Sequence, residues 1–394
     1  MFGTISNDLQ KLINDLRKLV LFFTQALKAA LPTFCGLPVE GVPDSLCRMK
    51  SIQLIAHGTP GQFQLRDVSE PIPAKGEVLV QIFACGLNHL DLWFEEGVLP
   101  IPIQLPRTPG CEIAGCIVTT GEGVKAWKKG DRVAVQSNIF CGQCEYCGRG
   151  EESLCLNSEM VGVQRDGGFA EKVVVPERAL VRLPDKVDFE TSAALTLAGS
   201  TAAHMLASRA NVRAGDWVLV MGASSGVGSA AIQIARQLGA HVIATASSQP
   251  KKELALKLGA EHVVNAADNE SWPAEVRKIT AKHGVDLIVE HIGGNVLEQA
   301  FNCLARGGAI VTCGATAGRD VTLNLWPLFV KEHRLIGSYG RNRVDLERTL
   351  EWAAAGTLHP VIHQVFPLAE TPRAFAALRD RQVLGKLVIR TASP

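Results

Sequence analysis

The chain has 394 residues, of which 47% are hydrophobic and 20% charged, and its formal net charge is +1. This length predicts roughly two or three domains, and the composition is that of a well-buried globular protein. The balanced charge argues against a nucleic-acid-binding protein, which needs a strong positive field. The N-terminal region lacks the pattern of a signal peptide, and its longest apolar run, Leu19 to Phe23, is too short to span a membrane. We therefore expect a cytoplasmic protein.

Residues 1–48 are interpreted as an N-terminal extension made of an amphipathic helix and a linker. Apolar residues recur at helical spacing between Ser6 and Leu27, and a segment rich in Pro and Gly follows. Three hypotheses stay open. The helix serves oligomerisation or, as a less favoured form of the same idea, contacts a membrane surface; it packs on its own domain; or Met49 is the natural start of the protein.

From Met49 to about Leu197, short apolar segments alternate with turns rich in Gly, Pro and Asp, which predicts an irregular β-rich domain with a barrel-like core. The expected strands are Glu77–Phe83, Ile113–Thr119, Asp131–Val135 and Lys172–Val175.

From residue 198 to about residue 338, apolar runs alternate with helical patterns, which is typical of βαβ units and a parallel sheet. The expected strands are Trp217–Met221, His241–Ala246, Val263–Asn265, Asp286–Glu290 and Ala309–Cys313, and the expected helices are Gly228–Leu238 and Lys251–Leu258. Beyond Ser338 we expect a helix and two short strands, and we interpret residues 339–394 as a return to the first domain. Those two strands are Gln364–Pro367 and Gly385–Arg390.

A glycine-rich turn between the first of these strands and its helix predicts a dinucleotide site. Glycine permits a tight turn and lets backbone N–H groups approach a pyrophosphate at the helix N-terminus. Ser225 stands at the middle glycine position of the usual fingerprint, but the flanking strands and helix supply the expected context. The residues expected to bind the cofactor here are Gly222, Ser224, Ser225, Gly226, Val227 and Gly228.

The end of the second strand of this unit favours NADP(H) over NAD(H). An NAD-preferring site places an acidic side chain there to bind the ribose 2′-hydroxyl. This chain instead has two hydroxyls and two lysines, which suit a 2′-phosphate through charge-assisted hydrogen bonds. These residues are Ser247, Ser248, Lys251 and Lys252.

Four cysteines within fifteen residues predict a metal site. They are Cys141, Cys144, Cys147 and Cys155. Four thiolates can surround one Zn²⁺ ion tetrahedrally and leave no coordination position open. Such a closed site stabilises a loop and takes no part in chemistry, so we expect one structural zinc per chain.

A four-cysteine segment between a β-rich domain and a dinucleotide unit resembles the medium-chain zinc alcohol dehydrogenase/quinone oxidoreductase superfamily. The resemblance extends from Met49 to Arg390. It includes the glycine turn and the segments Gly110–Gly115, Gly130–Val133 and Gly385–Lys386.

The resemblance implies an α/β protein with two domains and an active site in the cleft between them. One is a GroES-like β-rich catalytic domain, residues 49–197 completed by residues 339–394. The other is a Rossmann-type doubly wound parallel sheet, residues 198–338.

Members of this superfamily that use a catalytic zinc supply a Cys, a His and a Cys or Asp as ligands. The corresponding positions hold Asn88, Cys111 and Leu197, and Leu90 replaces the Ser or Thr of the proton relay. One thiolate and one amide make a poor open zinc site, which normally has three good protein ligands. The resemblance therefore implies a site without catalytic zinc.

The pattern Asn88-x-x-Asp91 resembles the quinone reductase branch, which works without a catalytic metal, so Asn88 and Asp91 are the expected catalytic residues. The Asn88 amide would stabilise a developing enolate oxygen, and Asp91 would orient its neighbours. A second zinc stays open as an alternative. Its ligands would be Cys85, Cys111, Glu112 and His89.

The glycine-rich ends of later strands are expected to line the nicotinamide, and Lys386 is expected near the pyrophosphate. The lining residues are His291, Gly293, Cys313 and Gly314. We expect an NADPH-dependent oxidoreductase, a homodimer or homotetramer, that transfers a hydride to a quinone or to an enone or enal. Two rival hypotheses remain: a zinc-dependent alcohol dehydrogenase with atypical ligands, and a non-enzymatic NADPH-binding protein.

A chain that begins at Met49 is predicted to fold, to retain zinc and to bind NADPH with near-unchanged affinity. The expected cleft is built from residues after Asn88, so the N-terminal extension contributes no residue to it. Zinc analysis and an NADPH titration of the truncated protein test this prediction. A folded truncated protein that fails to bind NADPH would place the extension in the catalytic unit.

Overall fold

The computed structural model describes residues 48–266 and 271–392. The helix expected between Ser6 and Leu27 lies outside the described residues, as does the linker that follows it. None of the described helices is long and apolar enough to cross a membrane.

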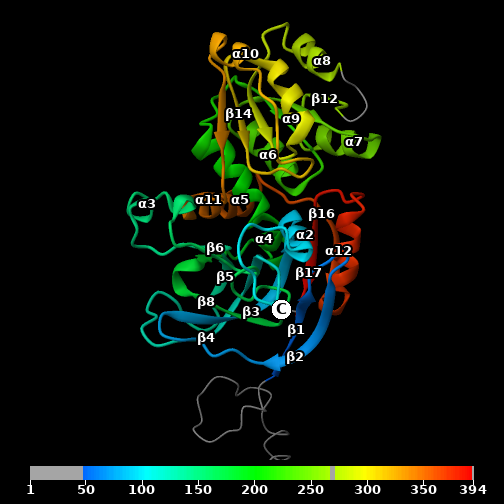
Figure 1. Cartoon of the computed structure of the whole chain (residues 1–394). Coiled ribbons are helices and arrows are strands. Elements are labelled where there is room, and N and C mark those ends of the chain that lie inside the picture. The colour runs from blue at the N-terminus through cyan, green and yellow to red at the C-terminus, as the bar shows by residue number, and fades with distance from the viewer. Residues whose placement is uncertain (1–47, 267–270, 393–394) are drawn as a thin grey trace, which may run out of the picture. The chain divides into compact units, whose positions relative to one another are not determined.

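The first part of the chain forms a β-rich unit, drawn in blue to green in Figure 1. Its strands are β1 (Arg48–Ala56), β2 (Gln62–Ser69), β3 (Glu77–Leu87), β4 (Glu112–Thr120), β5 (Arg132–Val135), β6 (Asn138–Ile139), β7 (Glu159–Met160), β8 (Lys172–Pro176) and β9 (Leu180–Arg182). Its helices are α2 (His89–Glu96), α3 (Glu145–Gly148) and α4 (Phe189–Leu195). The four strands expected from the sequence are confirmed as β3, β4, β5 and β8.

The last part of the chain returns to this unit. Its elements are α11 (Arg343–Ala354), β16 (Ile362–Pro367), α12 (Thr371–Arg379) and β17 (Lys386–Arg390). Strand β17 pairs antiparallel with β3, with Val388 opposite Gly86, and β16 pairs parallel with β17. The seven-stranded sheet therefore joins strands from both ends of the described chain.

The core of this sheet follows from the alternation of side chains along β3. Val78, Val80 and Ile82 are fully buried and lie in one hydrophobic cluster with Ile113 and Ile117 of β4. Successive side chains of a strand point to opposite faces, so three β-branched residues at every second position form one continuous apolar face.

The middle of the chain forms a six-stranded parallel sheet with the strand order β12-β11-β10-β13-β14-β15. Its strands are β10 (Trp217–Val220), β11 (His241–Thr245), β12 (His262–Val264), β13 (Val285–Glu290), β14 (Leu304–Thr312) and β15 (Arg334–Gly337). Its helices are α5 (Ala198–Ala203), α6 (Gly226–Gln237), α7 (Gln249–Lys257), α8 (Trp272–Ile279), α9 (Gly294–Ala300) and α10 (Leu325–Val330). This order is that of a Rossmann fold, which confirms the expected fold class.

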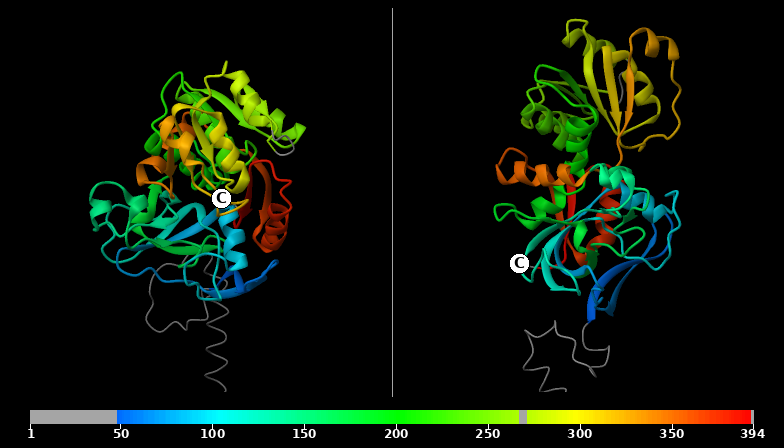
Figure 2. Two further views of the ribbon diagram at one scale, coloured as in Figure 1. Left: turned by 45° about the horizontal axis from the view of Figure 1, so that its top comes forward. Right: turned by 90° about the vertical axis from the view of Figure 1, so that its left-hand side faces the viewer.

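Helices cover both faces of the parallel sheet, as the two views of Figure 2 show. Val218 and Val220 of β10 pack with Ile234 of α6 on one face. Leu219 packs with Trp272 of α8 on the other face. A strand that is buried on both faces has an uninterrupted run of apolar residues, which is why β10 could be predicted from the sequence.

One strand is longer than the sequence predicted. Strand β14 begins at Leu304, before the expected start at Ala309, and its pairing with β13 shifts between Val285 and Leu287. The polar and glycine residues Arg306–Gly308 lie at this irregularity and interrupt the apolar pattern that marks a strand.

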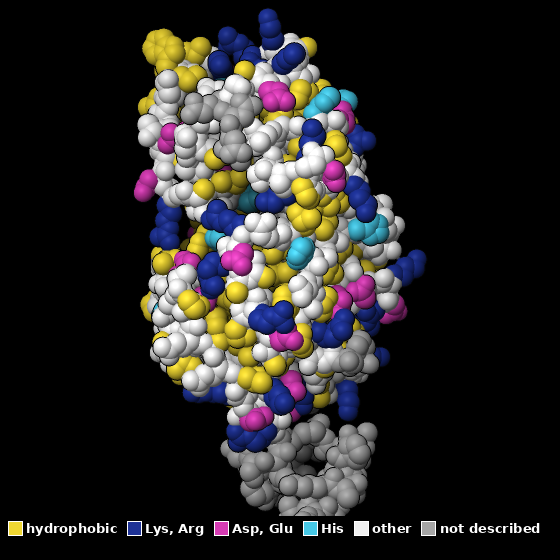
Figure 3. Space-filling view, turned by 90° about the vertical axis from the view of Figure 1, so that its right-hand side faces the viewer, with side chains coloured by type: hydrophobic (Ala, Val, Ile, Leu, Met, Phe, Trp, Pro, Cys, Tyr) yellow, Lys and Arg dark blue, Asp and Glu magenta, His cyan; other side chains and the backbone are white. Residues whose placement is uncertain are grey.

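The face of the molecule in Figure 3 carries basic and acidic side chains interspersed, without a continuous patch of one sign. This distribution agrees with the near-zero net charge.

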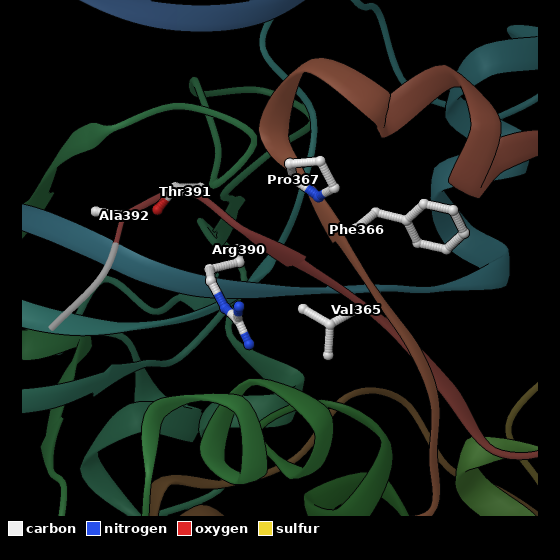
Figure 4. A pocket seen from close by; sticks show the side chains of 6 residues that line it. All are labelled: Val365, Phe366, Pro367, Arg390, Thr391 and Ala392. Carbon is white, nitrogen blue, oxygen red and sulfur yellow. The ribbon is translucent and has the colours of Figure 1, made fainter.

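A small hollow of about 270 Å³ lies at the ends of β16 and β17 (Figure 4). Its lining includes Arg390, whose guanidinium is already paired with Glu190 at 2.5 Å. The hollow contains none of the residues expected to bind cofactor, substrate or metal, so we do not identify it as the active site.

Candidate functional site

The four clustered cysteines form a site of the right size for zinc. All four sulfur atoms lie within 4.8 Å of one another. Cys147 Sγ lies 3.9 Å from Cys141 Sγ and 3.5 Å from Cys144 Sγ. Sulfur atoms at a Zn–S distance of about 2.3 Å in a tetrahedron would be roughly 3.8 Å apart. The donor set therefore fits one closed, structural zinc ion.

Backbone groups support the same site. The Cys141 N–H donates to Cys155 Sγ at 3.2 Å, and the Cys144 N–H donates to Cys141 Sγ at 3.4 Å. Backbone hydrogen bonds lower the pKa of Cys144 to about 6, whereas burial raises the pKa of its neighbour Cys147 to about 12, so the support for the site comes from its geometry.

Among the residues that the structure describes, this is the single group of three or more Cys, His, Asp or Glu side chains whose ligand atoms gather closely enough to hold a metal ion. The alternative second zinc site would use the side chains of Cys85, Cys111, Glu112 and His89. Their ligand atoms do not lie close enough together to form such a group.

The glycine turn lies at the point where the strand order reverses between β10 and β13. Ser225 Oγ caps α6 by accepting the Gly228 N–H at 2.8 Å, and the Gly222 N–H donates to Thr245 Oγ1 at 2.9 Å. A Cβ atom on Gly228 would lie 2.2 Å from Gly222 O, so the turn closes only with glycine there. This turn and helix N-terminus fit the pyrophosphate of a nicotinamide dinucleotide.

Two serines follow β11, and two lysines lie in the first turn of α7. Ser247 and Ser248 are exposed, and Lys251 Nζ donates to Ser247 Oγ at 3.3 Å. Lys252 is also exposed, and no acidic residue occurs between residues 246 and 252. Hydroxyl and ammonium groups thus lie at the carboxyl end of β11, where the adenosine ribose of a dinucleotide would bind.

Two residues expected near the nicotinamide follow β13 and β14. His291 Nε2 lies 3.0 Å from Ser225 Oγ, so the side chain reaches across to the glycine turn. Burial, with a smaller effect of His89, lowers the pKa of His291 to about 4, so its imidazole is neutral at pH 7. Burial also raises the pKa of Cys313 to about 12, which keeps it a thiol. A Cβ atom on Gly314 would lie 2.9 Å from His291 O, which places these strand ends side by side.

Glu290 is a positioning residue that the sequence analysis missed. Its fully buried carboxylate accepts the N–H groups of Ile292 and Gly293 at 2.5 and 2.6 Å, and the Thr312 hydroxyl at 2.7 Å. It therefore joins the carboxyl ends of β13 and β14. The sequence feature that could have identified Glu290 is an acidic residue at the end of the largely apolar strand β13.

A buried ion pair lies beside the two expected catalytic residues. Lys386 Nζ, on β17, lies 2.6 Å from Glu112 Oε2, on β4, and both side chains are almost fully buried. The same ammonium donates to Asn88 Oδ1 at 2.6 Å and to Leu87 O at 2.8 Å. Its three N–H donors are therefore all used by the protein.

Both carboxylate oxygens of Glu112 also have hydrogen-bond partners within the protein. Its Oε1 accepts the backbone N–H groups of Leu197 and Ala198 at 2.6 and 3.1 Å, and its Oε2 also accepts Asn88 Nδ2 at 2.9 Å. A Cβ atom on Gly86 would lie 2.5 Å from Oε2, so only glycine leaves room for this carboxylate. Four donors in total hold the charge of Glu112 in place.

The two expected catalytic residues both take part in this network. Asn88 Nδ2 donates to Glu112 and, at 3.4 Å, to Gly86 O, so its amide N–H groups have protein partners. Asp91 Oδ2 accepts the Asn88 backbone N–H at 2.8 Å, as the third residue of a helix does in a capping box. The Asn88-x-x-Asp91 spacing thus has a local structural role at the start of α2. Burial raises the pKa of Asp91 to about 7.

Lys386 links this network to the glycine turn. A Cβ atom on Gly226 would lie 2.6 Å from Lys386 Cδ, and the Gly385 N–H donates to Ser224 O at 2.7 Å. The side-chain stem therefore passes the turn where the pyrophosphate is expected, while the ammonium ends at Glu112.

The residues at the positions of a catalytic zinc do not fit that ion. Leu197 offers no ligand atom and the Asn88 amide is held by Lys386 and Glu112, so Cys111 is the single good ligand left at these three positions. The Lys386 ammonium also lies in direct contact with the Asn88 oxygen that would face such an ion.

Replacing Lys386 by Met is predicted to lower the free energy of unfolding by about 3–5 kcal/mol, because it leaves the Glu112 charge buried and unpaired. The double variant Lys386→Met/Glu112→Gln should recover part of this loss, since no charge then remains. Urea unfolding of both variants, with Lys257→Met on the surface of α7 as control, measures the difference. A single variant as stable as the parent protein would contradict the pairing.

Replacing Cys147 by Ser is predicted to release zinc and to lower the melting temperature more than the turnover of the surviving folded fraction. The closed site stabilises a loop and leaves no coordination position for substrate. Zinc analysis, calorimetry and activity measured on the same sample test this. Loss of turnover without loss of stability would give the site a chemical role.

The comparisons with known proteins agree with this geometry. The family model described as alcohol dehydrogenase GroES-like domain matches residues 74–185, and that described as zinc-binding dehydrogenase matches residues 226–355. An alcohol dehydrogenase of Geobacillus stearothermophilus is 33% identical over 83% of this chain and 96% of its own length.

Two solved structures are similar over most of the chain. The structure of an NAD-dependent alcohol dehydrogenase has a TM-score of 0.84 and 38% identity, and the match covers 87% of this chain and 100% of that one. A zinc-binding dehydrogenase of Sinorhizobium meliloti bound to NADP has a TM-score of 0.78 and 27% identity, and the match covers 87% of this chain and 99% of that one. The chain thus belongs to the zinc-binding medium-chain dehydrogenase/reductase superfamily and is an NAD(P)H-dependent oxidoreductase.

Proposed function

We propose that this oxidoreductase uses NADPH to reduce a quinone or the activated double bond of an enone or enal, and that it carries one structural zinc and no catalytic zinc. The observation that carries the proposal is the buried Lys386–Glu112 pair, which holds the Asn88 side chain by hydrogen bonds from Lys386 and to Glu112. Within residues 48–266 and 271–392, the four-cysteine site is the group of side chains that fits a metal ion.

The cofactor supplies a hydride, and the chain's own residues bind and orient both reactants. A metal-free site polarises a simple carbonyl less strongly than a Lewis acid does. Quinones and enones suit such a site, because their conjugation spreads the charge that hydride addition creates. With the Asn88 amide already bonded within the protein, backbone N–H groups and the nicotinamide ribose are the remaining stabilising donors.

An alcohol dehydrogenase acting on alcohols or aldehydes is the second candidate. The names of the similar proteins favour it. It requires a second zinc ion on atypical ligands in the cleft.

Zinc content and substrate range together separate the two candidates. We expect one zinc per chain after mild dialysis, and NADPH oxidation with quinones and enones in preference to saturated aldehydes. Two zinc ions per chain with preferential oxidation of alcohols would overturn the proposal in favour of the second candidate.

The preference for NADPH rests on the absence of an acid after β11 and on the hydroxyl and ammonium groups in its place. Losing one charge-assisted hydrogen bond to a 2′-phosphate costs about 1.5–3 kcal/mol. We therefore expect Lys251→Met to lower the affinity for NADPH relative to NADH by about tenfold or more. Fluorescence titration with both cofactors, with Lys257→Met as control, tests this; tighter binding of NADH than NADPH by the parent protein would contradict the preference.

A further inference from the structure

The zinc loop, residues 141–158, has no hydrophobic anchor of its own. It contains the four cysteines and α3, and none of its residues is buried. Two hydrogen bonds tie it to the rest of the described chain, and both end at the start of α11. The Ser153 N–H donates to Asn342 Oδ1 at 3.0 Å, and Glu152 accepts the Arg343 N–H at 3.3 Å.

The start of α11 is joined in turn to the segment that continues α5. Asp345 Oδ2 accepts the Asn342 N–H at 3.0 Å and lies 2.7 Å from His204 Nδ1. The other oxygen of Asp345 accepts the Ser208 hydroxyl at 2.5 Å. His204 and Ser208 belong to the π-helical turn His204–Arg209, which follows α5 directly. A fully buried carboxylate therefore connects the helix start that holds the zinc loop to the end of α5.

Helix α5 supports the glycine turn where the cofactor pyrophosphate is expected. A Cβ atom on Gly226 would lie 3.1 Å from Ala198 Cβ, so the start of α5 packs directly on the turn. A Cβ atom on Gly199 would lie 3.0 Å from Thr349 Cγ2, so α11 packs closely along α5. Glu112 holds the start of α5 by accepting the Ala198 N–H at 3.1 Å. With a second carboxylate at its other end, α5 presents a fixed surface to the turn.

We propose that Asn342 and Asp345 are positioning residues for the dinucleotide site, which couple zinc on the four cysteines to cofactor binding at the glycine turn. A loop without buried side chains is ordered by its metal ion. When zinc is lost, the loop no longer holds Asn342, the end of α5 loosens, and the cofactor must order this helix as it binds. The inference rests on the proposed structural zinc and is independent of which substrate is reduced.

Other contacts limit the size of this coupling. The Arg343 guanidinium donates to the carbonyls of Arg178 and Leu180 at 3.1 and 2.8 Å, so α11 stays docked on the β-rich unit when the loop loosens. We therefore expect zinc and NADPH each to raise the affinity for the other by about 5- to 10-fold, the lower part of the range usual for coupled sites. The two factors must be equal, because coupling between two binding equilibria is reciprocal.

The test measures both binding equilibria on the full chain. Zinc affinity is obtained by competition with a colorimetric chelator, with and without saturating NADPH, and NADPH affinity by fluorescence titration of the zinc-loaded protein. Asn342→Ala removes the acceptor of the Ser153 N–H. It should abolish the effect of NADPH on zinc affinity and raise the Kd for NADPH by about 5-fold or more, with kcat at saturating NADPH unchanged. A merely structural role would not separate KM from kcat in this way.

Three further variants complete the test. Asn342→Asp keeps an oxygen acceptor at the same position and should retain the coupling. Ser208→Ala removes the hydroxyl that Asp345 binds from the side of α5; it should weaken the coupling, and it decides the matter if Asn342→Ala does not fold. Asn324→Ala removes an exposed asparagine that accepts the Trp326 N–H at 3.0 Å at the start of α10, and it should leave both affinities unchanged.

A zinc affinity of the parent protein that is the same with and without NADPH would refute the inference, and so would coupling that survives Asn342→Ala intact. The zinc content is measured first, because a parent protein without zinc would overturn the proposed metal site and this inference together. Tighter binding of NADH than NADPH would overturn only the proposed cofactor preference, and the same measurements with NADH then decide the inference.

Discussion

The contact between the Lys386 ammonium and the Glu112 carboxylate is the constraint on which the rest of the site depends. It joins β17 to β4, and through Asn88 it fixes the start of α2, while the backbone of Leu197 and Ala198 is held from the other side. Two buried charges are tolerable only when every donor and acceptor is satisfied, and here each of them is. The ion pair and its hydrogen bonds therefore tie four separate segments of the chain to one another.

The buried cations Lys386 and Arg341 differ in their hydrogen bonding. Lys386 is fully paired, so it organises the protein and has no donor left for a ligand. Arg341 retains two nitrogen atoms without a hydrogen-bond partner among the described residues.

Much of the fold could be predicted from local sequence patterns. The site could be predicted only in part, because it depends on contacts between residues far apart in the sequence. The strand–turn–helix around Gly228 and the four cysteines near Cys144 are each encoded within a few residues, so the confirmed fold class could be derived from them. The contact between Arg341 and Ser137 spans 204 residues and leaves no local pattern. The spacing of Asn88 and Asp91 shows a third difficulty, because the same separation that suggests chemistry also suits a helix cap.

Asn88 and Lys386 are 298 residues apart in the sequence. Because the chain is synthesised from its N-terminus, this separation has a consequence for folding in the cell. Strands β3 and β4 leave the ribosome long before β17, and the parallel sheet between them has a core on both faces that can form first. During that interval the edge of β3 that later receives β17 is open, and Glu112 lacks its ammonium partner. The nascent chain, rather than the finished enzyme, is therefore the form most exposed to aggregation.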